Sequence, residues 1–262
     1  MKIVMDFDGT LSYGSRADGK KNSSIAVLRD GGYLSEDYDL AAHALHDKYY
    51  TIEKDHNLSH DVRLAAMHNW WNEHSELLIK SGLTKEIMER AGKSHYVILR
   101  AGIKEFFNFL KENDIGTYIF TAGRRDLVYY TLIEEGIDID EDHIVGNYFI
   151  YNKDGQAIDY NRPQITSMDK DESVILDESN HVHDSIRDKY RTSQSTIILG
   201  DGEGDANMVK EGEIYRIGFL NMSPDEIGYT ERLAHFQSIY DVVLDANASL
   251  YEVTKIIKEK VI

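Results

Sequence analysis

Hydrophobic and polar positions change their period along the chain, and the changes predict where strands and helices lie. Residues 2–7 form a short apolar run that ends in acidic residues, the pattern of a buried strand. From about residue 37 to 92 the apolar positions recur at helical spacing, and no run has strand character. Further on, strands alternate with helices, and strands are predicted at 117–121, 197–200, 214–219 and 239–244. The pattern predicts an α/β fold, a Rossmann-like parallel sheet with a helical cap inserted after the first strand.

Local signals mark the predicted helix ends and the domain boundaries. Ser59 and Thr84 precede helical stretches as N-caps, and Gly82 and Gly92 follow such stretches as stops. Ser249 opens a final helix with a capping-box pattern. Two apolar stripes of the insert are expected to be buried: Leu40, Ala44 and Leu45, and Val62, Ala65, Ala66, Trp70 and Leu77. We expect a catalytic core formed by residues 1–15 and 97–262, and a helical cap formed by residues 16–96.

Composition narrows the classes of function. The 262 residues include 46 acidic and 29 basic side chains, a formal net charge of −17, which excludes a basic nucleic-acid clamp. Cysteine is absent, so disulfides, thiolate metal sites and cysteine nucleophiles are excluded, and carboxylates become the first candidates for chemistry. No apolar run reaches the roughly 18 residues that span a bilayer, and the first residues lack a signal-peptide pattern. We expect a cytoplasmic protein without a membrane partner.

An acidic pair follows the first predicted strand in the run Asp6-Phe7-Asp8-Gly9-Thr10. Because side chains alternate along extended backbone, Asp6 and Asp8 point to the same side, and Gly9 allows the chain to turn away. The two carboxylates then stand at the mouth of the sheet. An ordinary solvated acidic turn explains such a short motif equally well.

A second motif, Thr121-Ala122-Gly123-Arg124-Arg125, lies at the end of another predicted strand. The Thr121 hydroxyl and the following backbone N–H groups, placed ahead of a helix, form an anion-binding seat. For this motif alone, an ordinary strand-to-helix turn with Thr121 as the N-cap is the better interpretation.

Three glycines alternate with three acidic residues in the run 200–205, which contains Asp201 and Asp205. Clustered carboxylates repel one another and glycine costs conformational entropy, so a bound cation explains the run better than stability does. Oxygen ligands without cysteine favour magnesium over zinc. A flexible acidic loop is the less favoured alternative.

A lysine is expected to neutralise the bound anion. Lys170 is the candidate, as a point charge for phosphate oxygens, and Lys153 and Lys189 compete with it on sequence grounds alone.

In chain order the motifs are an acid pair, a hydroxyl anion seat, a lysine and an acidic glycine loop. This series resembles the haloacid dehalogenase-like phosphatases, in which an aspartate attacks phosphorus beside a bound metal. Residues 49–55 and 67–78 of the insert resemble the cap of the cytosolic pyrimidine 5′-nucleotidase family, cytosolic 5′-nucleotidase III-like, and the tail 239–244 resembles that family as well. The resemblance covers essentially the whole chain.

The resemblance implies hydrolysis of a nucleoside 5′-monophosphate through an aspartyl-phosphate, with Mg2+ as cofactor. It implies the roles of particular residues: Asp6 as nucleophile, Asp8 as acid and base, and Thr121, Ala122 and Lys170 as the phosphate site. It makes Asp6, the Asp8 carbonyl and Asp201 the metal site, and we expect Asp205 to orient the metal shell. Glu53 falls on the cap glutamate that contacts the base, and one of Trp70 and Trp71 is expected to face the base as well. The partner implied is a small nucleotide, and a monomer is favoured.

Three departures from the family leave the base preference open among CMP, UMP and methylated purine nucleotides. His74 stands where the family has a serine near the substrate, with Ser75 next to it, and we expect His74 to contact the base. The 12–24 loop lacks the Cys-Pro stretch of the family, and the segment between Lys170 and Asp201 looks longer. Two other functions stay open from sequence: a phosphatase of the same superfamily that acts on phosphoserine or a sugar phosphate, and an inactive nucleotide-binding protein.

Overall fold

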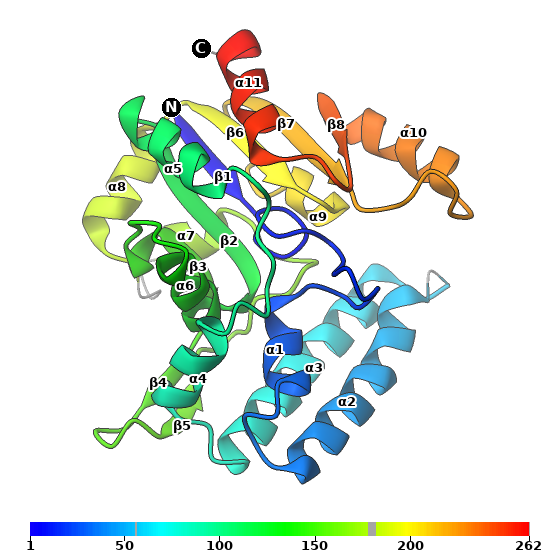
Figure 1. Cartoon of the computed structure of the whole chain (residues 1–262), viewed down its shortest axis with the longest axis vertical. Coiled ribbons are helices and arrows are strands. Elements are labelled where there is room, and N and C mark those ends of the chain that lie inside the picture. Colours follow the sequence, from blue (N-terminus) through cyan, green and yellow to red (C-terminus); the bar gives the residue numbers. More distant parts are fainter. Residues whose placement is uncertain (56, 178–181, 262) are drawn as a thin grey trace.

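The computed structural model describes residues 1–55, 57–177 and 182–261 (Figure 1). Its centre is a six-stranded sheet in the order β3-β2-β1-β6-β7-β8, and all neighbouring strands are parallel. The strands are β1 (Lys2–Met5), β2 (Gly116–Arg124), β3 (Ile144–Asn147), β6 (Ser195–Gly200), β7 (Glu213–Leu220) and β8 (Val242–Asp245). The predicted fold class, a parallel α/β sheet, is confirmed.

Strand β1 occupies the middle of the sheet because it can be buried on both faces. Ile3 and Met5 belong to the core cluster on one face, and Val4, which alternates with them, belongs to the cluster on the other face. The strand order reverses at β1, between β2 and β6. In open parallel sheets, ligands bind outside the carboxyl ends of the strands at such a reversal, which places Asp6 at the expected binding crevice.

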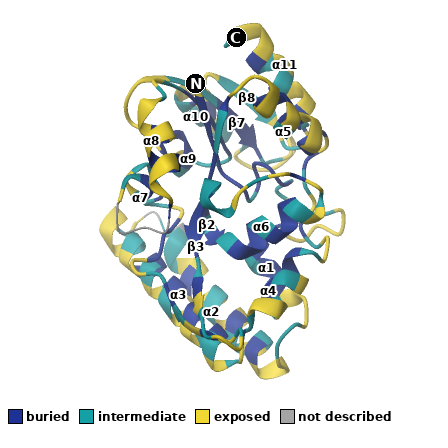
Figure 2. Cartoon of the chain, turned by 90° about the vertical axis from the view of Figure 1, so that its left-hand side faces the viewer, coloured by how far each residue is buried: buried dark blue, intermediate teal, exposed yellow. Residues whose placement is uncertain are grey.

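Helices cover both faces of the sheet, and β1, β3 and β6 are almost entirely buried, whereas the edge strand β8 is only partly so (Figure 2). These helices are α5 (Ile103–Glu112), α6 (Arg125–Glu134), α7 (Ser173–Leu176), α8 (Asp184–Thr192), α9 (Glu203–Ala206), α10 (Tyr229–Ile239) and α11 (Leu250–Lys260), with a 3-10 turn at Glu141–His143. The capping box predicted at Ser249 is present at the start of α11. No helix in the described ranges is long and apolar enough to cross a lipid bilayer.

Four helices form the insert between β1 and α5: α1 (Ser24–Asp30), α2 (Glu36–Lys54), α3 (His60–Lys80) and α4 (Lys85–Gly92). Helices α2 and α3 pack side by side below the carboxyl end of the sheet (Figure 1). The predicted N-caps are confirmed, because Ser59 Oγ accepts from Val62 N at 3.4 Å and Thr84 Oγ1 accepts from Ile87 N at 3.2 Å. The insert is therefore helical, as its periodicity predicts.

Several details of the prediction are wrong. Leu40 is 72% exposed and Val62 is 51% exposed, and Ala44 and Ala65 are exposed as well, although all four were expected on buried stripes. The buried face of α2 carries Tyr38, Ala42 and Tyr49, which leaves Leu40 on the outer side. The last strand begins at residue 242 rather than 239, because α10 continues through Ile239.

A two-stranded antiparallel hairpin, β4 (Phe149–Tyr151) and β5 (Ala157–Tyr160), was not predicted. It lies outside residues 16–96 in sequence but is attached to the insert. The N–H of Lys85 donates to Gly155 O at 2.8 Å, and the Tyr160 hydroxyl donates to Glu76 Oε1 at 3.3 Å. The insert therefore rests on the hairpin as well as on the sheet.

Candidate active site

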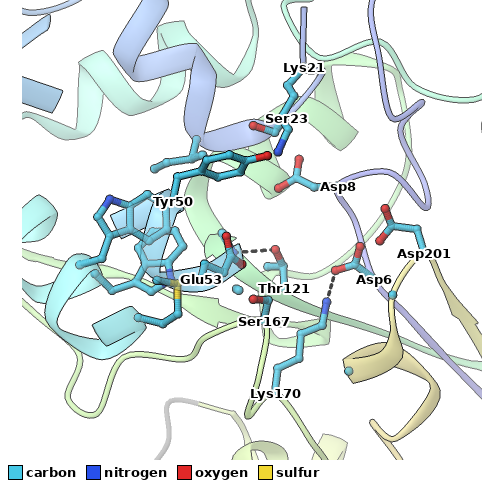
Figure 3. Close-up of a pocket in the computed structure, with 18 of the residues that line it drawn as sticks. Asp6, Asp8, Lys21, Ser23, Tyr50, Glu53, Thr121, Ser167, Lys170 and Asp201 are labelled. Atoms are coloured by element: carbon cyan, nitrogen blue, oxygen red, sulfur yellow. Dashed lines mark hydrogen bonds and ion pairs between the residues drawn. The ribbon is translucent and has the colours of Figure 1, made fainter. Parts of the chain in front are cut away.

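A cavity of about 470 Å³ opens between the carboxyl ends of β1, β2 and β6 and the helices of the insert (Figure 3). Side chains from the sheet and the loops after it form one wall: Asp6, Asp8, Thr121, Ala122, Lys170, Asp201 and Asp205. Side chains from the insert form the other: Lys21, Arg29, Tyr49, Tyr50, Glu53, Met67, Trp70 and Trp71. The cavity is thus polar and acidic on the sheet side and largely aromatic on the side of α2 and α3.

Asp6 lies one residue beyond β1 and is 5% exposed. Its backbone N–H continues the sheet by donating to Leu199 O at 3.0 Å. Its carboxylate is held at both oxygens, because the Lys170 ammonium contacts Oδ1 and the Thr10 hydroxyl donates to Oδ2 at 3.2 Å. The carboxylate therefore has a fixed direction at the floor of the cavity.

Asp8 is bound by the start of α1. The backbone N–H of Ser24 donates to Asp8 Oδ1 at 2.6 Å, and its hydroxyl donates to Oδ2 at 2.7 Å. Burial raises the pKa of Asp8, and these two hydrogen bonds oppose that shift. Gly9, at φ +85°, makes the turn between Asp8 and the next residues, and a Cβ there would lie 2.2 Å from Asp201 Oδ2. The glycine therefore permits the close approach of the two acidic loops.

Asp6, Asp201 and Asp205 each present one carboxylate oxygen, and the three atoms lie within 4.8 Å of one another. Asp205 Oδ2 fastens the loop by accepting from the N–H groups of Asp201 and Gly202, at 2.9 and 2.8 Å. Burial raises the pKa of Asp6, and burial together with the charge of Asp205 raises that of Asp201 to about 7. A set of oxygen donors whose charges repel one another fits a hard divalent cation such as Mg2+.

Lys170 comes from the loop before α7 and reaches this acidic cluster. Its Nζ contacts Asp6 and lies 2.8 Å from Asp205 Oδ1. Burial alone lowers the pKa of Lys170, but the carboxylates of Asp205 and Asp6 outweigh burial, and the net shift is upward. Lys170 is therefore an ammonium at neutral pH. Lys153 and Lys189, its competitors in sequence, do not line this cavity.

Thr121 lies within β2 on the cavity wall, where its Oγ1 accepts from Gly123 N at 2.9 Å. The alternative interpretation of Thr121 as an N-cap is wrong, because α6 begins at Arg125 and Arg124 occupies the cap position. Ala122 and Gly123 also line the cavity. The hydroxyl and the neighbouring backbone thus face the same space as Asp6 and Lys170.

The structure brings three of the four predicted base-contacting residues to the cavity. Glu53 points into it from α2 (Figure 3). Trp70 and Trp71 line it from α3, with their ring centroids 4.7 Å apart. His74 does not line the cavity. It is 3% exposed, its Nε2 lies 3.0 Å from the Tyr38 hydroxyl, and burial lowers its pKa to about 3.

Sequence reasoning missed Asn221 and Arg100. Asn221 Nδ2 donates to Asp201 Oδ2 and to Gly9 O, both at 2.9 Å. The guanidinium of Arg100 donates in turn to Asn221 Oδ1 at 3.0 Å and to Gly9 O at 2.9 Å. One signal for Asn221 was available: it directly follows β7, at the same sheet edge as the predicted acids.

Comparison with known sequences gives consistent matches. A family model described as pyrimidine 5′-nucleotidase (UMPH-1) matches residues 10–261. A putative cytosolic 5′-nucleotidase 3 from Caenorhabditis elegans is 27% identical over 262 residues, covering 97% of this chain and 68% of the relative. A 7-methylguanosine phosphate-specific 5′-nucleotidase from Rattus norvegicus is 30% identical over 256 residues, covering 95% of this chain and 81% of the relative.

Solved structures share the fold. Cytosolic 5′-nucleotidase IIIB bound to cytidine aligns with a TM-score of 0.81 at 24% identity, covering 99% of this chain and 86% of that one. A phosphoserine phosphatase in its apo form aligns with a TM-score of 0.56 at 18% identity, covering 97% and 98%. The core therefore has the fold of haloacid dehalogenase-like phosphatases. Together with the family match, these similarities show that the chain belongs to the pyrimidine 5′-nucleotidase (UMPH-1) family and is a 5′-nucleotidase, a phosphoric monoester hydrolase.

Proposed function

We propose that this enzyme hydrolyses nucleoside 5′-monophosphates, pyrimidine nucleotides foremost, through an aspartyl-phosphate formed on Asp6. The observation that carries the proposal is the carboxylate of Asp6, fixed by Lys170 and Thr10 at the floor of a cavity whose opposite wall is aromatic. A carboxylate is a weak nucleophile that needs no deprotonation at neutral pH, so positioning and charge neutralisation make its attack feasible.

The phosphate would bind between Asp6 and the end of β2. Lys170 offers an ammonium, Thr121 a hydroxyl, and Ala122 and Gly123 line the same space. An oxygen of Asp6 forms the new bond to phosphorus while the bond from phosphorus to the 5′ oxygen breaks. Hydrogen bonds and positive charge from these residues stabilise the charge that spreads over the phosphoryl oxygens.

Asp8 would move the proton. In the first step it protonates the departing 5′ oxygen, and in the second it takes a proton from the water that attacks the aspartyl-phosphate. The raised pKa that burial gives Asp8 favours the protonated form needed first. The two hydrogen bonds from Ser24 fix the direction of this carboxyl group. The products are a nucleoside and inorganic phosphate, and Asp6 is regenerated.

Magnesium fits the acidic cluster, with Asp6, the Asp8 carbonyl and Asp201 as ligands and Asp205 as the residue that holds the loop. When bound, the ion neutralises phosphate charge and relieves the repulsion among the carboxylates. Asn221, through its hydrogen bond to Asp201, restricts the direction of one ligand oxygen.

The insert would act as a cap that selects the nucleoside. We propose residues 16–96 as this cap and Glu53, Trp70 and Trp71 as base contacts, because these side chains line the cavity opposite the phosphate site. Flat aromatic walls can stack on a planar base, whereas phosphoserine and a sugar phosphate have no ring that stacks on them. His74 is left out of this proposal because it lies behind the wall. A relative named cytosolic supports a cytoplasmic location for the enzyme.

Phosphate release from a panel of CMP, UMP, GMP, phosphoserine and a sugar phosphate tests the proposal. We expect CMP and UMP to be the best substrates, and we expect turnover to stop when magnesium is chelated and to return when it is added. Preference for phosphoserine or the sugar phosphate would replace the proposal with a different phosphatase. Absence of turnover for every compound would leave a nucleotide-binding protein.

A further inference from the structure

Arg124 places a positive charge behind the aromatic wall of the cavity. It is the last residue of β2 and is fully buried. Its guanidinium donates to Gln164 Oε1 at 2.9 Å and to Ser75 Oγ at 2.7 Å. The guanidinium carbon lies 4.8 Å from the centroid of the Trp71 ring and 4.6 Å from that of Phe149. The cation is thus held by two neutral oxygens and two aromatic rings.

Within the described residues no carboxylate forms an ion pair with this charge, although the charge of Asp126 acts on it from further away. The hydrogen bonds of its side chain go to Gln164 and Ser75, and its Nε has no hydrogen-bond partner. Burial lowers the pKa of Arg124 to about 10, so the guanidinium stays charged at neutral pH. Asp126, two residues away in sequence, accepts a hydrogen bond from the Tyr151 hydroxyl at 2.8 Å. A charge without a direct ion pair in a poorly polarisable interior acts over a longer distance than a surface charge does.

Trp71 separates this charge from the cavity. Trp71 lines the cavity and Arg124 does not. Trp71 and Ser75 are one helical turn apart on α3, so both point to the side of the helix where the guanidinium lies. A base stacked on the cavity side of this wall would lie about 8 Å from the guanidinium, the sum of the 4.8 Å to the ring and a stacking distance of roughly 3.5 Å.

We propose that Arg124 is a specificity-determining residue that selects against nucleotides whose base carries a positive charge, such as N7-methylated purine nucleotides. The proposal rests on the proposed function, in which the base lies against Trp71. A cation behind the indole draws electron density from the ring and weakens its attraction for a second cation. It also repels that cation directly, whereas a neutral pyrimidine base carries no charge to repel.

Glu53 acts in the opposite sense, because its carboxylate faces the same cavity and would attract a cationic base. The contribution of Arg124 is therefore measured by removing its charge while Glu53 stays in place. Two ligands separate charge from shape: 7-methylguanosine monophosphate, with a cationic base at about pH 6, and its 7-methyl-7-deaza analogue, which has nearly the same shape and a neutral base.

The experiment compares kcat/KM for these two nucleotides in wild type, Arg124→Met and Arg124→Lys. We expect Arg124→Met to raise the ratio of kcat/KM for the charged nucleotide to kcat/KM for the neutral one by about tenfold. This is the size of effect that two charges about 8 Å apart have in a partly screened interior. Arg124→Lys keeps the charge and should leave the ratio within about twofold of wild type. Each ratio is taken within one variant, so a change in the folded fraction cancels.

An unchanged ratio in Arg124→Met overturns the inference, and so does an equal rise in Arg124→Lys, which would indicate altered packing instead of charge. If Arg124→Met does not fold, Arg124→Gln is the second neutral variant. Dissociation constants of the two corresponding nucleosides, measured by calorimetry, give the same ratio without turnover. Failure of the proposed hydrolysis and failure of this inference are therefore separate results.

Discussion

The carboxylate of Asp6 is held at both of its oxygens. Lys170 contacts one oxygen and the Thr10 hydroxyl donates to the other. A nucleophile gains from a held direction of attack. On the cap side, the acidic residue that faces the cavity is Glu53 of α2. Substitutions at these two residues separate chemistry from recognition.

Asp6→Asn should lower kcat by at least about three powers of ten, because it removes the attacking carboxylate at nearly constant shape. Phosphate release from CMP measures the rate. A radiolabelled phosphoenzyme should be trapped by acid quench in wild type and not in the variant, while circular dichroism shows an unchanged fold. Activity within tenfold of wild type would contradict a covalent mechanism on Asp6.

Glu53→Ala should lower kcat/KM for nucleotides by about one to two powers of ten, if the carboxylate accepts hydrogen bonds from the base. Hydrolysis of p-nitrophenyl phosphate should barely change, because the phosphate site stays intact. Glu36→Ala is the matched control, since Glu36 lies on the same helix, is exposed and does not line the cavity. Equal losses on both substrates would instead assign Glu53 to cap structure.

At the scale of elements, α3 joins the cap to the core through one of its faces. Trp70 and Trp71 line the cavity, and Ser75, one turn further, bonds to Arg124 of β2. His74 lies between these positions and stacks on Trp70 with ring centroids 6.1 Å apart. Its buried imidazole is neutral at physiological pH, because burial and the charge of Arg124 both lower its pKa. Protonation of His74 at low pH would therefore weaken its contact with Tyr38, which joins α3 to α2.

His74→Gln should reduce the acid sensitivity of stability. The pKa of His74 is about 3 in the folded state, against 6.5 for the unfolded reference, so the unfolded chain binds more protons as the pH falls below 6.5. The stabilisation is complete above that value and is lost progressively toward pH 3. When the pH falls from 7.5 to 5, the free energy of unfolding of the wild type should decrease by about 2 kcal/mol more than that of the variant.

The free energy of unfolding of both proteins, from urea titrations at the two pH values with a chelator present, measures this difference. A constant difference between the two proteins across the range would show that His74 takes up its proton as easily in the folded state as in the unfolded one.

Elements with a strong periodic pattern were predictable, and those defined by tertiary contact were not. The apolar runs of β1 and β6, the helical insert and the caps at Ser59 and Thr84 were read correctly from local sequence. The β4–β5 hairpin was missed because its strands have three and four residues and depend on contact with the insert. Exposure of Leu40 could not be foreseen, since which face of a helix is buried depends on its neighbours.

In the site as well, residues placed by local sequence were predictable and residues placed by tertiary contact were not. The residues at strand ends, such as Asp6 and Asp201, were predicted because their position follows from the parallel sheet. Arg124 and Arg100 were passed over because a buried arginine has no local signature, and most arginines are exposed. His74 was assigned by its sequence position, but its neighbours on α3 decide that it faces Tyr38.

At the scale of the whole molecule, Arg100 ties segments from opposite ends of the chain together. Besides its bonds to Gly9 and Asn221, it donates to the carbonyls of Thr10 at 2.8 Å, Ala246 at 2.9 Å and Ala248 at 2.7 Å. Its side chain is fully buried, and the guanidinium carbon lies 3.8 Å from the centroid of the Phe219 ring. The loop after Asp8 and the segment before α11 are therefore held by a single side chain.

Arg100→Met should lower the free energy of unfolding by about 3 kcal/mol or more, because it leaves several buried acceptors without donors. Guanidinium unfolding followed by fluorescence measures the change. Arg90→Met is the matched control, since Arg90 is exposed on α4, and it should change stability little. A similar small change at both positions would show that water replaces the Arg100 donors at no cost.

The central position of β1 has a consequence for synthesis on the ribosome. β1 is flanked by β2 on one side and by β6 on the other, and β6 begins at Ser195. At a translation rate of about 5 to 20 residues per second, roughly 10 to 40 seconds pass between the emergence of β1 and that of β6. During this interval an apolar strand has an open edge, which can pair with another chain. Asp6 and Asp201 likewise meet only after β6 has emerged, so the growing polypeptide acquires its acidic cluster late, in a single step.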